Sequence, residues 1–139
     1  PSHLKVVEEF GYEMYMHCGA IRKVLLAWQT PAFIDEYFKN IILHDQAFPH
    51  VRPDDLREEL KKIRQDGYAI THGEYVTDAL GIGAPVFNSD GELAGSIGII
   101  APEIRVDTPE FLDTQKDLVQ FYASSLSADL GYEKHDVFQ

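Results

Sequence analysis

The 139-residue sequence predicts a single α+β domain in which helices flank an antiparallel sheet. One observation is the order of the segments: three helical patterns precede a strong hairpin signal, and one long helical pattern follows it. Another is the composition, with 45% hydrophobic and 25% charged residues, which is ordinary for a folded globular protein. The chain is long enough for one hydrophobic core, so we expect residues 1–139 to form one domain.

The first third of the chain reads as a short strand followed by two helices. Residues 4–10 are predicted to be the strand, and residues 20–29 a helix with apolar side chains at helical spacing. Thr30 is the expected N-cap of the next helix, with Pro31 at its first position. The apolar stripe of this second helix, residues 31–42, is expected to consist of Phe33, Ile34, Tyr37, Phe38 and Ile41.

Two further helices are marked by proline at the start and glycine at the end. One begins at Pro53 and stops at Gly67, and within it Glu58 and Lys62 are spaced to pair across a turn. Its narrow apolar stripe comprises Leu56, Leu60 and Ile63. The other, about 20 residues long, begins at Thr108-Pro109 and ends at Gly131. Its buried side is predicted to consist of Leu112, Leu118, Val119, Tyr122, Leu126 and Leu130.

Three segments in the middle of the chain read as strands: residues 68–70, 79–87 and 93–101. Asp90-Gly91 between the last two is a strong signal for a two-residue hairpin turn. That turn places Gly81 opposite Ile100, Gly83 opposite Gly98, Pro85 opposite Ser96 and Phe87 opposite Ala94. All of these share one face of the hairpin, which is therefore nearly bare in its middle, whereas the other face is bulky and apolar.

A bare face on an apolar hairpin has two physical explanations. Either a helix packs closely over it and glycine lets its backbone approach, or the small side chains leave a hollow for a small molecule. A phosphate-binding loop is the least favoured explanation, because Gly81 and Gly83 lack the further glycine or the Lys-Ser/Thr of the known loops, and a hairpin follows in place of a helix.

Charge, hydropathy and cysteine content exclude several classes of function. The net charge of −11 repels nucleic acid, so this chain alone is not expected to bind DNA. No apolar run approaches the ~20 residues that span a bilayer, and we expect no membrane partner. The N-terminus does not resemble a secretory signal, and the single cysteine, Cys18, fits a reducing cytoplasm. The histidines show no metal-ligand spacing, although a zinc site built from distant residues stays open.

Catalytic patterns are equally weak. The serines have no nucleophile-elbow context, and His17 and Cys18 are adjacent residues that face opposite ways on a strand. Glu74 and Asp78 flank the entrance to the strand over 79–87 and are placed to orient a ligand or simply to be solvated. An enzyme using Cys18 or a His–carboxylate pair therefore remains the alternative to a binding domain, and no cofactor is expected.

Three stretches together resemble the effector-binding domain of the IclR family of bacterial transcription regulators. The first is GYEMYMHCGAIRKVLLA (residues 11–27), in which the family's positions are matched by Gly11, His17, Lys23, Leu26 and Ala27. The second, residues 56–69, resembles the family's helix ending in Gly-Tyr-Ala, and the third, residues 74–105, its Glu, small-residue strand and hairpin. They occur in the family's order over about 120 residues.

The resemblance implies a GAF-like domain that binds a small metabolite against the concave face of its sheet and assembles as a dimer or tetramer. In the family, DNA is contacted by a separate N-terminal winged helix-turn-helix. That module and its linker are not among these residues, and the start of the effector domain is expected to be trimmed. Activity as an enzyme is not expected, and the protein is expected in the bacterial cytoplasm. A closed oligomerisation module without a pocket is a further alternative.

The family's ligand-binding positions fall on residues of three segments of this chain. They are Ala20, Ile21, Thr71, Ala79, Gly81, Gly98 and Ile100. His17 and Ser96 are added as groups that could orient the ligand. Family members that bind small keto acids tend to carry hydroxyls, a thiol and an acid here, whereas this chain has Thr71, Gly81, Gly98 and Ile100. We therefore expect a roomier, less polar pocket that favours an aromatic or otherwise bulky metabolite.

Overall fold

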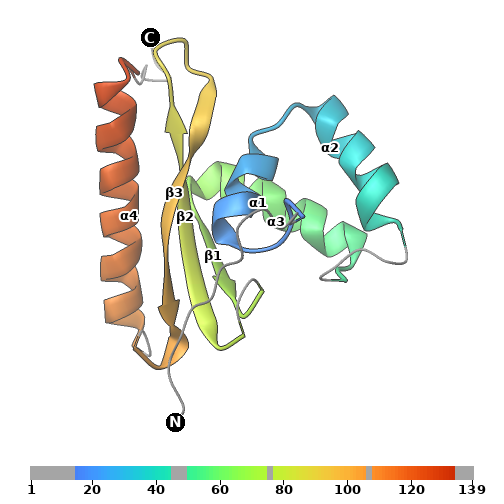
Figure 1. Ribbon diagram of the computed structural model, residues 1–139, viewed down its shortest axis with the longest axis horizontal. Coiled ribbons are helices and arrows are strands. Elements are labelled where there is room, and N and C mark those ends of the chain that lie inside the picture. Colours follow the sequence, from blue (N-terminus) through green and yellow to red (C-terminus); the bar gives the residue numbers. More distant parts are fainter. Residues whose placement is uncertain (1–14, 45–49, 75–76, 106–107, 134–139) are drawn as a thin grey trace.

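The computed structural model describes residues 15–44, 50–74, 77–105 and 108–133, and the strand predicted over 4–10 lies outside them. The described elements form three layers (Figure 1). A long helix, α4 (Pro109–Asp129), covers one face of a three-stranded sheet, and α1 (Ala20–Ala27) covers the other. Helix α3 (Pro53–Asp66) packs behind α1, and α2 (Pro31–Tyr37) lies farthest from the sheet.

The sheet is antiparallel, in the order β1 (Ala69–His72), β2 (Ala79–Phe87), β3 (Leu93–Pro102). The predicted register is confirmed from Gly81 opposite Ile100 to Pro85 opposite Ser96. It is wrong at Phe87, which lies opposite Leu93 because a bulge follows Val86.

The cause of the bulge is a hairpin loop longer than two residues. The Asn88 N–H bonds the Glu92 carbonyl at 2.9 Å, and the Asn88 side-chain oxygen accepts the N–H groups of Asp90 and Glu92. Gly91 adopts the left-handed φ of 78° that ends such a loop. The predicted two-residue turn at Asp90-Gly91 is therefore replaced by a loop of three residues closed by Asn88 and Glu92.

The helix predicted over residues 31–42 is an α-helix only as far as Tyr37, and Phe38–Ile42 continue it as a π-helix. Thr30 caps it as predicted, its side chain accepting the Phe33 N–H at 3.1 Å. The expected stripe is only partly right: Phe38 is buried and Ile34, Tyr37 and Ile41 are partly buried, whereas Phe33 is exposed. Ile42, which was not predicted, is buried beside Phe38. Phe33 lies about 140° around the helix from Phe38, so both cannot face the core.

Helix α3 has the predicted limits and the predicted buried stripe, Leu56, Leu60 and Ile63. Gly67 ends it with a φ of 82°. The expected Glu58–Lys62 pair is wrong, because the Lys62 ammonium bonds Asp66 at 2.9 Å and Glu58 pairs with Lys61. Within the described residues no helix combines the length and the apolarity needed to cross a membrane.

Helix α4 begins at its predicted cap but presents a different side to the sheet. Val119, Ala123 and Ser127 are buried, with Leu112 packed beside them. The predicted buried residues Leu118, Tyr122, Leu126 and Leu130 are instead between 42% and 57% exposed. The reason is the sheet face below: Leu80, Ile82 and Val86 are bulky, so small residues of α4 meet them. Ser127 fixes the rotation by accepting the Phe87 N–H at 2.9 Å.

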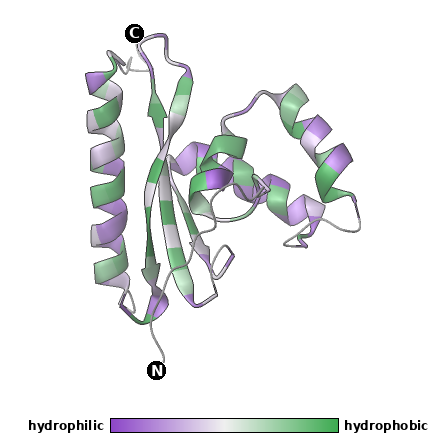
Figure 2. Cartoon of the chain, viewed as in Figure 1, coloured by the Kyte–Doolittle hydropathy of each residue, from purple (hydrophilic) through white to green (hydrophobic). Residues whose placement is uncertain are grey.

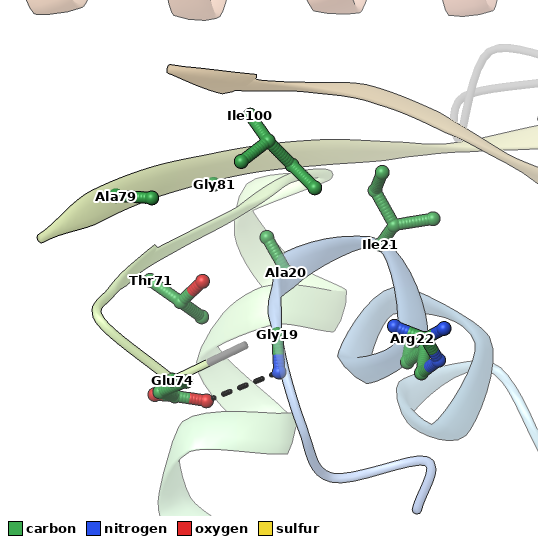
Figure 3. A pocket seen from close by; sticks show the side chains of 9 residues that line it. All are labelled: Gly19, Ala20, Ile21, Arg22, Thr71, Glu74, Ala79, Gly81 and Ile100. Carbon is green, nitrogen blue, oxygen red and sulfur yellow. Dashed lines mark hydrogen bonds between the residues drawn. The ribbon is translucent and has the colours of Figure 1, made fainter. Parts of the chain in front are cut away.

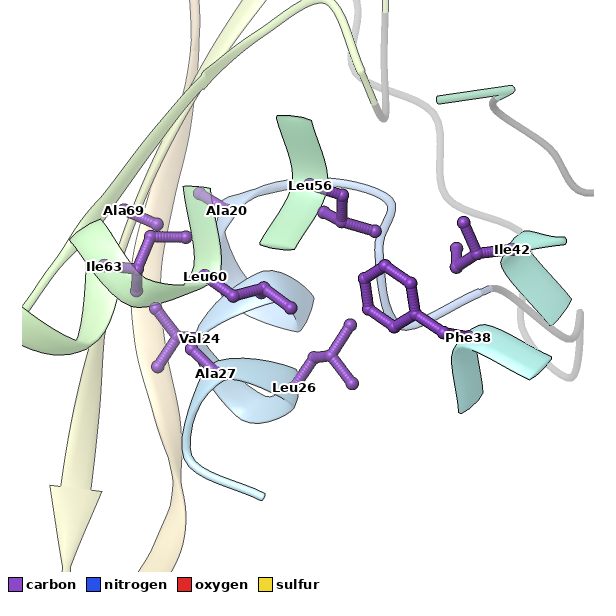
Figure 4. Close-up of a cluster of buried hydrophobic side chains, with 10 residues drawn as sticks. All are labelled: Ala20, Val24, Leu26, Ala27, Phe38, Ile42, Leu56, Leu60, Ile63 and Ala69. Atoms are coloured by element: carbon purple, nitrogen blue, oxygen red, sulfur yellow. The ribbon is translucent and has the colours of Figure 1, made fainter. Parts of the chain in front are cut away.

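The apolar interior consists of two clusters, one on each side of the sheet. Figure 4 shows the cluster between α1, α3 and the π-helix, where Leu26, Leu60 and Phe38 point toward one another. The second cluster lies between β2 and α4. Hydrophobic residues run along the strands and also recur along the whole of α4 (Figure 2), consistent with its partly exposed apolar face.

Candidate functional site

The middle of the small-residue face of β2 and β3 is covered by the first turn of α1. A Cβ atom on Gly83 would lie 3.0 Å from the Ala20 carbonyl oxygen and 3.1 Å from Ile21 Cα. On Gly98 it would collide with the Ile82 carbonyl oxygen and lie 2.9 Å from Ile21 Cγ1. Here the explanation by a closely packed helix is correct, and the glycines are needed for backbone contact.

A hollow remains at one end of the same face, where β1 and the start of β2 extend beyond α1 (Figure 3). Its free volume is about 30 Å³. Six of the predicted ligand-binding residues line it: Ala20, Ile21, Thr71, Ala79, Gly81 and Ile100. The fold thus brings together residues from α1 and all three strands, and their binding of a ligand stays a prediction.

The other three predicted residues do not line this hollow. Gly98 lies under Ile21 in the packed middle of the face. The Ser96 hydroxyl donates a hydrogen bond to the Ile21 carbonyl at 2.9 Å, so it anchors α1 to β3. His17 is fully buried, with Nδ1 2.9 Å from the Tyr37 hydroxyl. These three residues therefore belong to the packing around α1 and not to the open surface of the hollow.

Three residues that line the hollow were not among the predicted ligand-binding residues: Gly19, Arg22 and Glu74. Gly19 is the N-cap of α1 and has a φ of 93°, a conformation that favours glycine. Glu74 follows β1 and turns back toward α1, where its carboxylate accepts the Gly19 N–H at 3.4 Å. The sequence shows Glu74 as an acid near a strand entrance, but the contact with Gly19 joins residues 55 apart and carries no local signal.

A buried lysine holds Glu74 in this position. Lys23, on α1, is only 1% exposed, and its ammonium lies 2.7 Å from the Glu74 carboxylate. The same ammonium contacts both oxygens of Glu59, on α3, at 2.8 and 2.9 Å. A charge buried this deeply requires such partners. The cluster therefore ties α1, α3 and the loop after β1 together beside the hollow.

Cys18 lies next to this cluster and lacks the environment of a nucleophile. It is 1% exposed, and its thiol donates to the Glu74 carbonyl oxygen at 3.2 Å. Burial raises the pKa of the Cys18 thiol, Glu74 adds to this, and the nearby Arg22 and Lys23 only partly oppose it. Catalytic cysteines need the opposite shift. Among the residues that the structure describes, no three His, Cys, Asp or Glu side chains cluster to hold a metal ion.

Comparisons with known proteins agree with these features. Residues 1–128 match the family described as "Bacterial transcriptional regulator IclR C-terminal". The chain is 30% identical over 125 residues to the uncharacterized HTH-type transcriptional regulator RhmR of Escherichia coli (strain K12), which covers 88% of this chain and 47% of that protein. It is 25% identical to the regulator KipR of Bacillus subtilis (strain 168), covering 93% and 52% of the two chains.

Solved structures show the same fold. The crystal structure of the Thermotoga maritima IclR superposes with a TM-score of 0.78 and 26% identity, covering 94% of this chain and 53% of that one. The C-terminal domain of the E. coli regulator KdgR gives a TM-score of 0.71, with 84% of this chain and 71% of that domain covered. The chain spans about half the length of the curated relatives that it matches. The sequence therefore belongs to the IclR family of bacterial transcriptional regulators, as their C-terminal domain with its α+β, GAF-like fold.

Proposed function

We propose that this domain senses a small metabolite in the hollow beside α1 and passes that signal to a DNA-binding module of the same regulator. The observation that carries the proposal is the hollow itself, formed where α1, β1, β2 and β3 meet. DNA contact is assigned to a winged helix-turn-helix outside these residues, because the net charge of −11 opposes contact by this domain. In this proposal the regulator acts in the cytoplasm, without a cofactor and without catalysis.

The groups around the hollow favour a ligand with a carboxylate. Its wall contains the N-terminal turn of α1, where Gly19 offers no side-chain cap. First-turn N–H groups have no acceptor within their own helix and attract anions. Arg22 lines the same wall, and the Thr71 hydroxyl stands opposite as a hydrogen-bonding group (Figure 3).

The expected roomy pocket is not present in this conformation, so we propose a ligand of only a few heavy atoms. The free volume of about 30 Å³ is well below the roughly 150 Å³ of a cavity that takes up benzene. The cause is α1: the space left by Gly83 and Gly98 is filled by Ala20 and Ile21. A bulky aromatic metabolite would require α1 to move away from the sheet.

Movement of α1 is also the proposed route of the signal. A ligand shifts an equilibrium only by its different affinity for two states. A carboxylate at the first turn of α1 would compete with Glu74 for the Gly19 N–H and so disturb the Lys23 cluster that links α1 to α3. Typical coupling of ~1–3 kcal/mol between such a site and DNA binding changes operator affinity about 5- to 150-fold.

Self-association is the second part of the proposed function, and the exposed face of α4 supports it. Leu118, Phe121, Tyr122 and Leu126 are each more than 40% exposed on this one helix. A continuous apolar surface of this kind marks an interaction site. We assign it to contact between copies of the regulator, in a dimer or tetramer. Light scattering should show that a Tyr122→Glu variant dissociates, and an unchanged mass would remove α4 from the interface.

Calorimetry with pyruvate and with benzoate tests ligand binding and ligand size together. Pyruvate should bind the wild-type chain and benzoate should not. Gly81→Val fills the hollow and should weaken pyruvate at least about tenfold. Gly95→Val is the matched control, because a Cβ on Gly95 meets nothing within 4 Å. Tighter binding of benzoate, or equal loss in both variants, would contradict the proposed site.

A further inference from the structure

A second and much larger cleft lies at the opposite end of β2. Its volume is about 560 Å³, within the range of roughly 300–1,000 Å³ that is typical of small-molecule sites. It is enclosed by the ends of α1 and α3, the last residues of β2 and one side of α4. From Gly81 in the first hollow to Phe87 in this cleft, the strand extends about 20 Å. The two spaces are therefore separate.

One wall of the cleft is a row of three aromatic rings from distant parts of the chain. The ring centroids of Trp28 and Phe87 are 6.0 Å apart, and those of Phe87 and Tyr132 are 5.1 Å apart. All three residues are half-buried, so each is packed in place and still reachable. The N–H of Tyr132 also bonds the Ser127 carbonyl at 2.9 Å. The planes of Trp28 and Phe87 are inclined by 66° and those of Phe87 and Tyr132 by 37°, so an aromatic ligand can stack on one ring and contact its neighbours edge-on.

The adjacent edge of β2 is closed to a peptide strand. β1 pairs with β2 only as far as Ala69 opposite Gly83, so within the described part of the chain no strand pairs with Ala84–Phe87 on that side. Pro85 has no N–H to donate, and the N–H of Phe87 is already bound by Ser127. An added strand would find too few donors for a ladder, which favours a small molecule over an extended peptide.

The polar groups around the cleft favour an uncharged ligand. The lining contains one acidic and one basic side chain, Asp66 and Arg64, so its formal charges cancel. Asp66 also pairs with Lys62 at 2.9 Å, and the Arg64 guanidinium donates to the Ala27 carbonyl at 3.4 Å. The uncharged polar groups of the lining include the amides of Gln65 and Gln120 and the hydroxyl of Ser124, which both donate and accept hydrogen bonds. Such groups recognise the edge of a heterocycle.

We propose that this cleft is a second ligand site, which takes a neutral, planar aromatic heterocycle that packs against the aromatic wall of Trp28, Phe87 and Tyr132, stacking on one ring and meeting the others edge-on. Gln65, Gln120 and Ser124 contact its polar edge. The site is independent of the proposed metabolite hollow and goes beyond the function proposed above.

The fluorescence of Trp28 tests this directly, because it is the only tryptophan of the chain and lies in the cleft wall. The 139-residue chain is titrated with adenine and with nicotinamide, both uncharged near pH 7. A saturable change in emission is expected, with a dissociation constant of about 1 mM or tighter, equivalent to −4.1 kcal/mol. Benzoate and tetramethylammonium, as charged probes, should bind at least about tenfold more weakly.

Two variants of α4 make the test specific. Ser124→Leu narrows the cleft and should weaken adenine at least about tenfold, whereas Ser125→Leu lies outside the lining and should leave its affinity unchanged. Thermal unfolding confirms that both variants fold, and calorimetry with pyruvate should be unaffected in both. Absence of a saturable signal, equal loss in the two variants, or equal binding of charged probes would each overturn the proposal. Loss of pyruvate binding alone would concern only the first hollow.

Discussion

Along one face of β2 and β3, the middle of the hairpin and its ends have different neighbours. Gly83 and Gly98, in the middle, are in direct contact with the first turn of α1. At one end of this face Gly81 borders a hollow, whereas on the opposite face of β3 a Cβ on Gly95 would meet nothing within 4 Å. Within one hairpin, glycine thus allows a close backbone contact at Gly83 and Gly98, borders an open space at Gly81 and is unconstrained at Gly95.

This difference shows what a small residue does and does not specify. A glycine permits a close approach to the strand, but the group that approaches is determined by a distant element, here α1. The face is covered where the backbone of α1 contacts it, and it stays open beyond Gly19, where α1 begins. Stability should therefore depend on the middle of the face, and ligand binding on the end near Gly81.

The largest effect is expected for Gly98→Ala. Its Cβ would collide with the Ile82 carbonyl oxygen of the paired strand and press on Ile21. Neither strand can yield without breaking the register, so we expect a loss of more than about 3 kcal/mol in the free energy of unfolding. Urea unfolding followed by circular dichroism measures it. Gly95→Ala, on the same strand, should stay within about 0.5 kcal/mol of the wild type.

Gly98 is therefore unsuited to a test of ligand binding, because a larger side chain there collides with Ile82 and disturbs folding. A Gly98→Ala chain as stable as the wild type would show that β2 and Ile21 do not lie this close to Gly98.

The next-largest effect is expected from removing the charged cluster beside the hollow while the apolar contacts in the middle of the face stay intact. Lys23→Met leaves the carboxylates of Glu59 and Glu74 without their buried partner. Removing one member of a buried pair costs about 3–5 kcal/mol. The glutamate side chains are 36% and 27% exposed and can rehydrate, so we expect a smaller loss of about 2 kcal/mol in urea unfolding.

A surface lysine provides the control for this variant. The Lys61–Glu58 pair is about 70% exposed on both sides, and Lys61→Met should change stability by less than about 0.5 kcal/mol. Pyruvate affinity should rise only in Lys23→Met, because Glu74, which competes with the ligand carboxylate for the Gly19 N–H, is then no longer held beside it. Equal stability losses in the two variants would mean that the buried cluster does not support the hollow.

Much of the fold could be predicted because its signals are local. Caps and stops such as Thr30, Gly67 and Thr108 lie within one helical turn of what they control. The strand register follows from side-chain alternation and failed only at Phe87, beside the loop. The buried side of α4 could not be predicted from its own sequence, because larger apolar residues lie on the exposed side. The side of α4 that is buried depends on the bulky residues of the sheet face and on the hydrogen bond from the Phe87 N–H to the Ser127 hydroxyl.

The candidate site was predictable in part for the same reason. Alternation along β2 identifies Ala79 and Gly81 as sharing a face, and the family resemblance adds Ala20, Ile21 and Thr71. The roles of Glu74 and Lys23 depend on contacts between residues 51 apart, which no local pattern shows. The size of the hollow was missed because it depends on how far α1 reaches over the sheet.

A smaller contrast is expected between two neighbouring glycines of β2. A Cβ on Gly83 would press on the backbone of Ala20 and Ile21, whereas on Gly81 it would meet mainly the Thr71 side chain, at 3.0 Å. A side chain can rotate and a helix backbone cannot, so Gly83→Ala should cost about 1–2 kcal/mol and Gly81→Ala less than about 1 kcal/mol. Thermal unfolding of both variants tests the order, and its reversal would place α1 over the wrong end of the face.

The smallest expected effect is the pH dependence contributed by Cys18, at the hollow end of α1. Burial raises the pKa of the Cys18 thiol in the folded chain, while in the unfolded chain the thiol titrates near its ordinary value of about 8.5. Above that pH the unfolded state binds fewer protons than the folded state, so stability falls as pH rises, by less than about 1.4 kcal/mol per pH unit. Urea unfolding at pH 7.5, 8.5 and 9.5 should show a shallower decline for Cys18→Ala. The half-buried Tyr37, whose pKa is also raised by desolvation, should continue the decline above pH 10 in both chains. If the free energy of unfolding falls equally with pH in both chains below pH 9.5, the thiol is accessible to solvent. In that case α1 packs less tightly at this end of the face than in its middle.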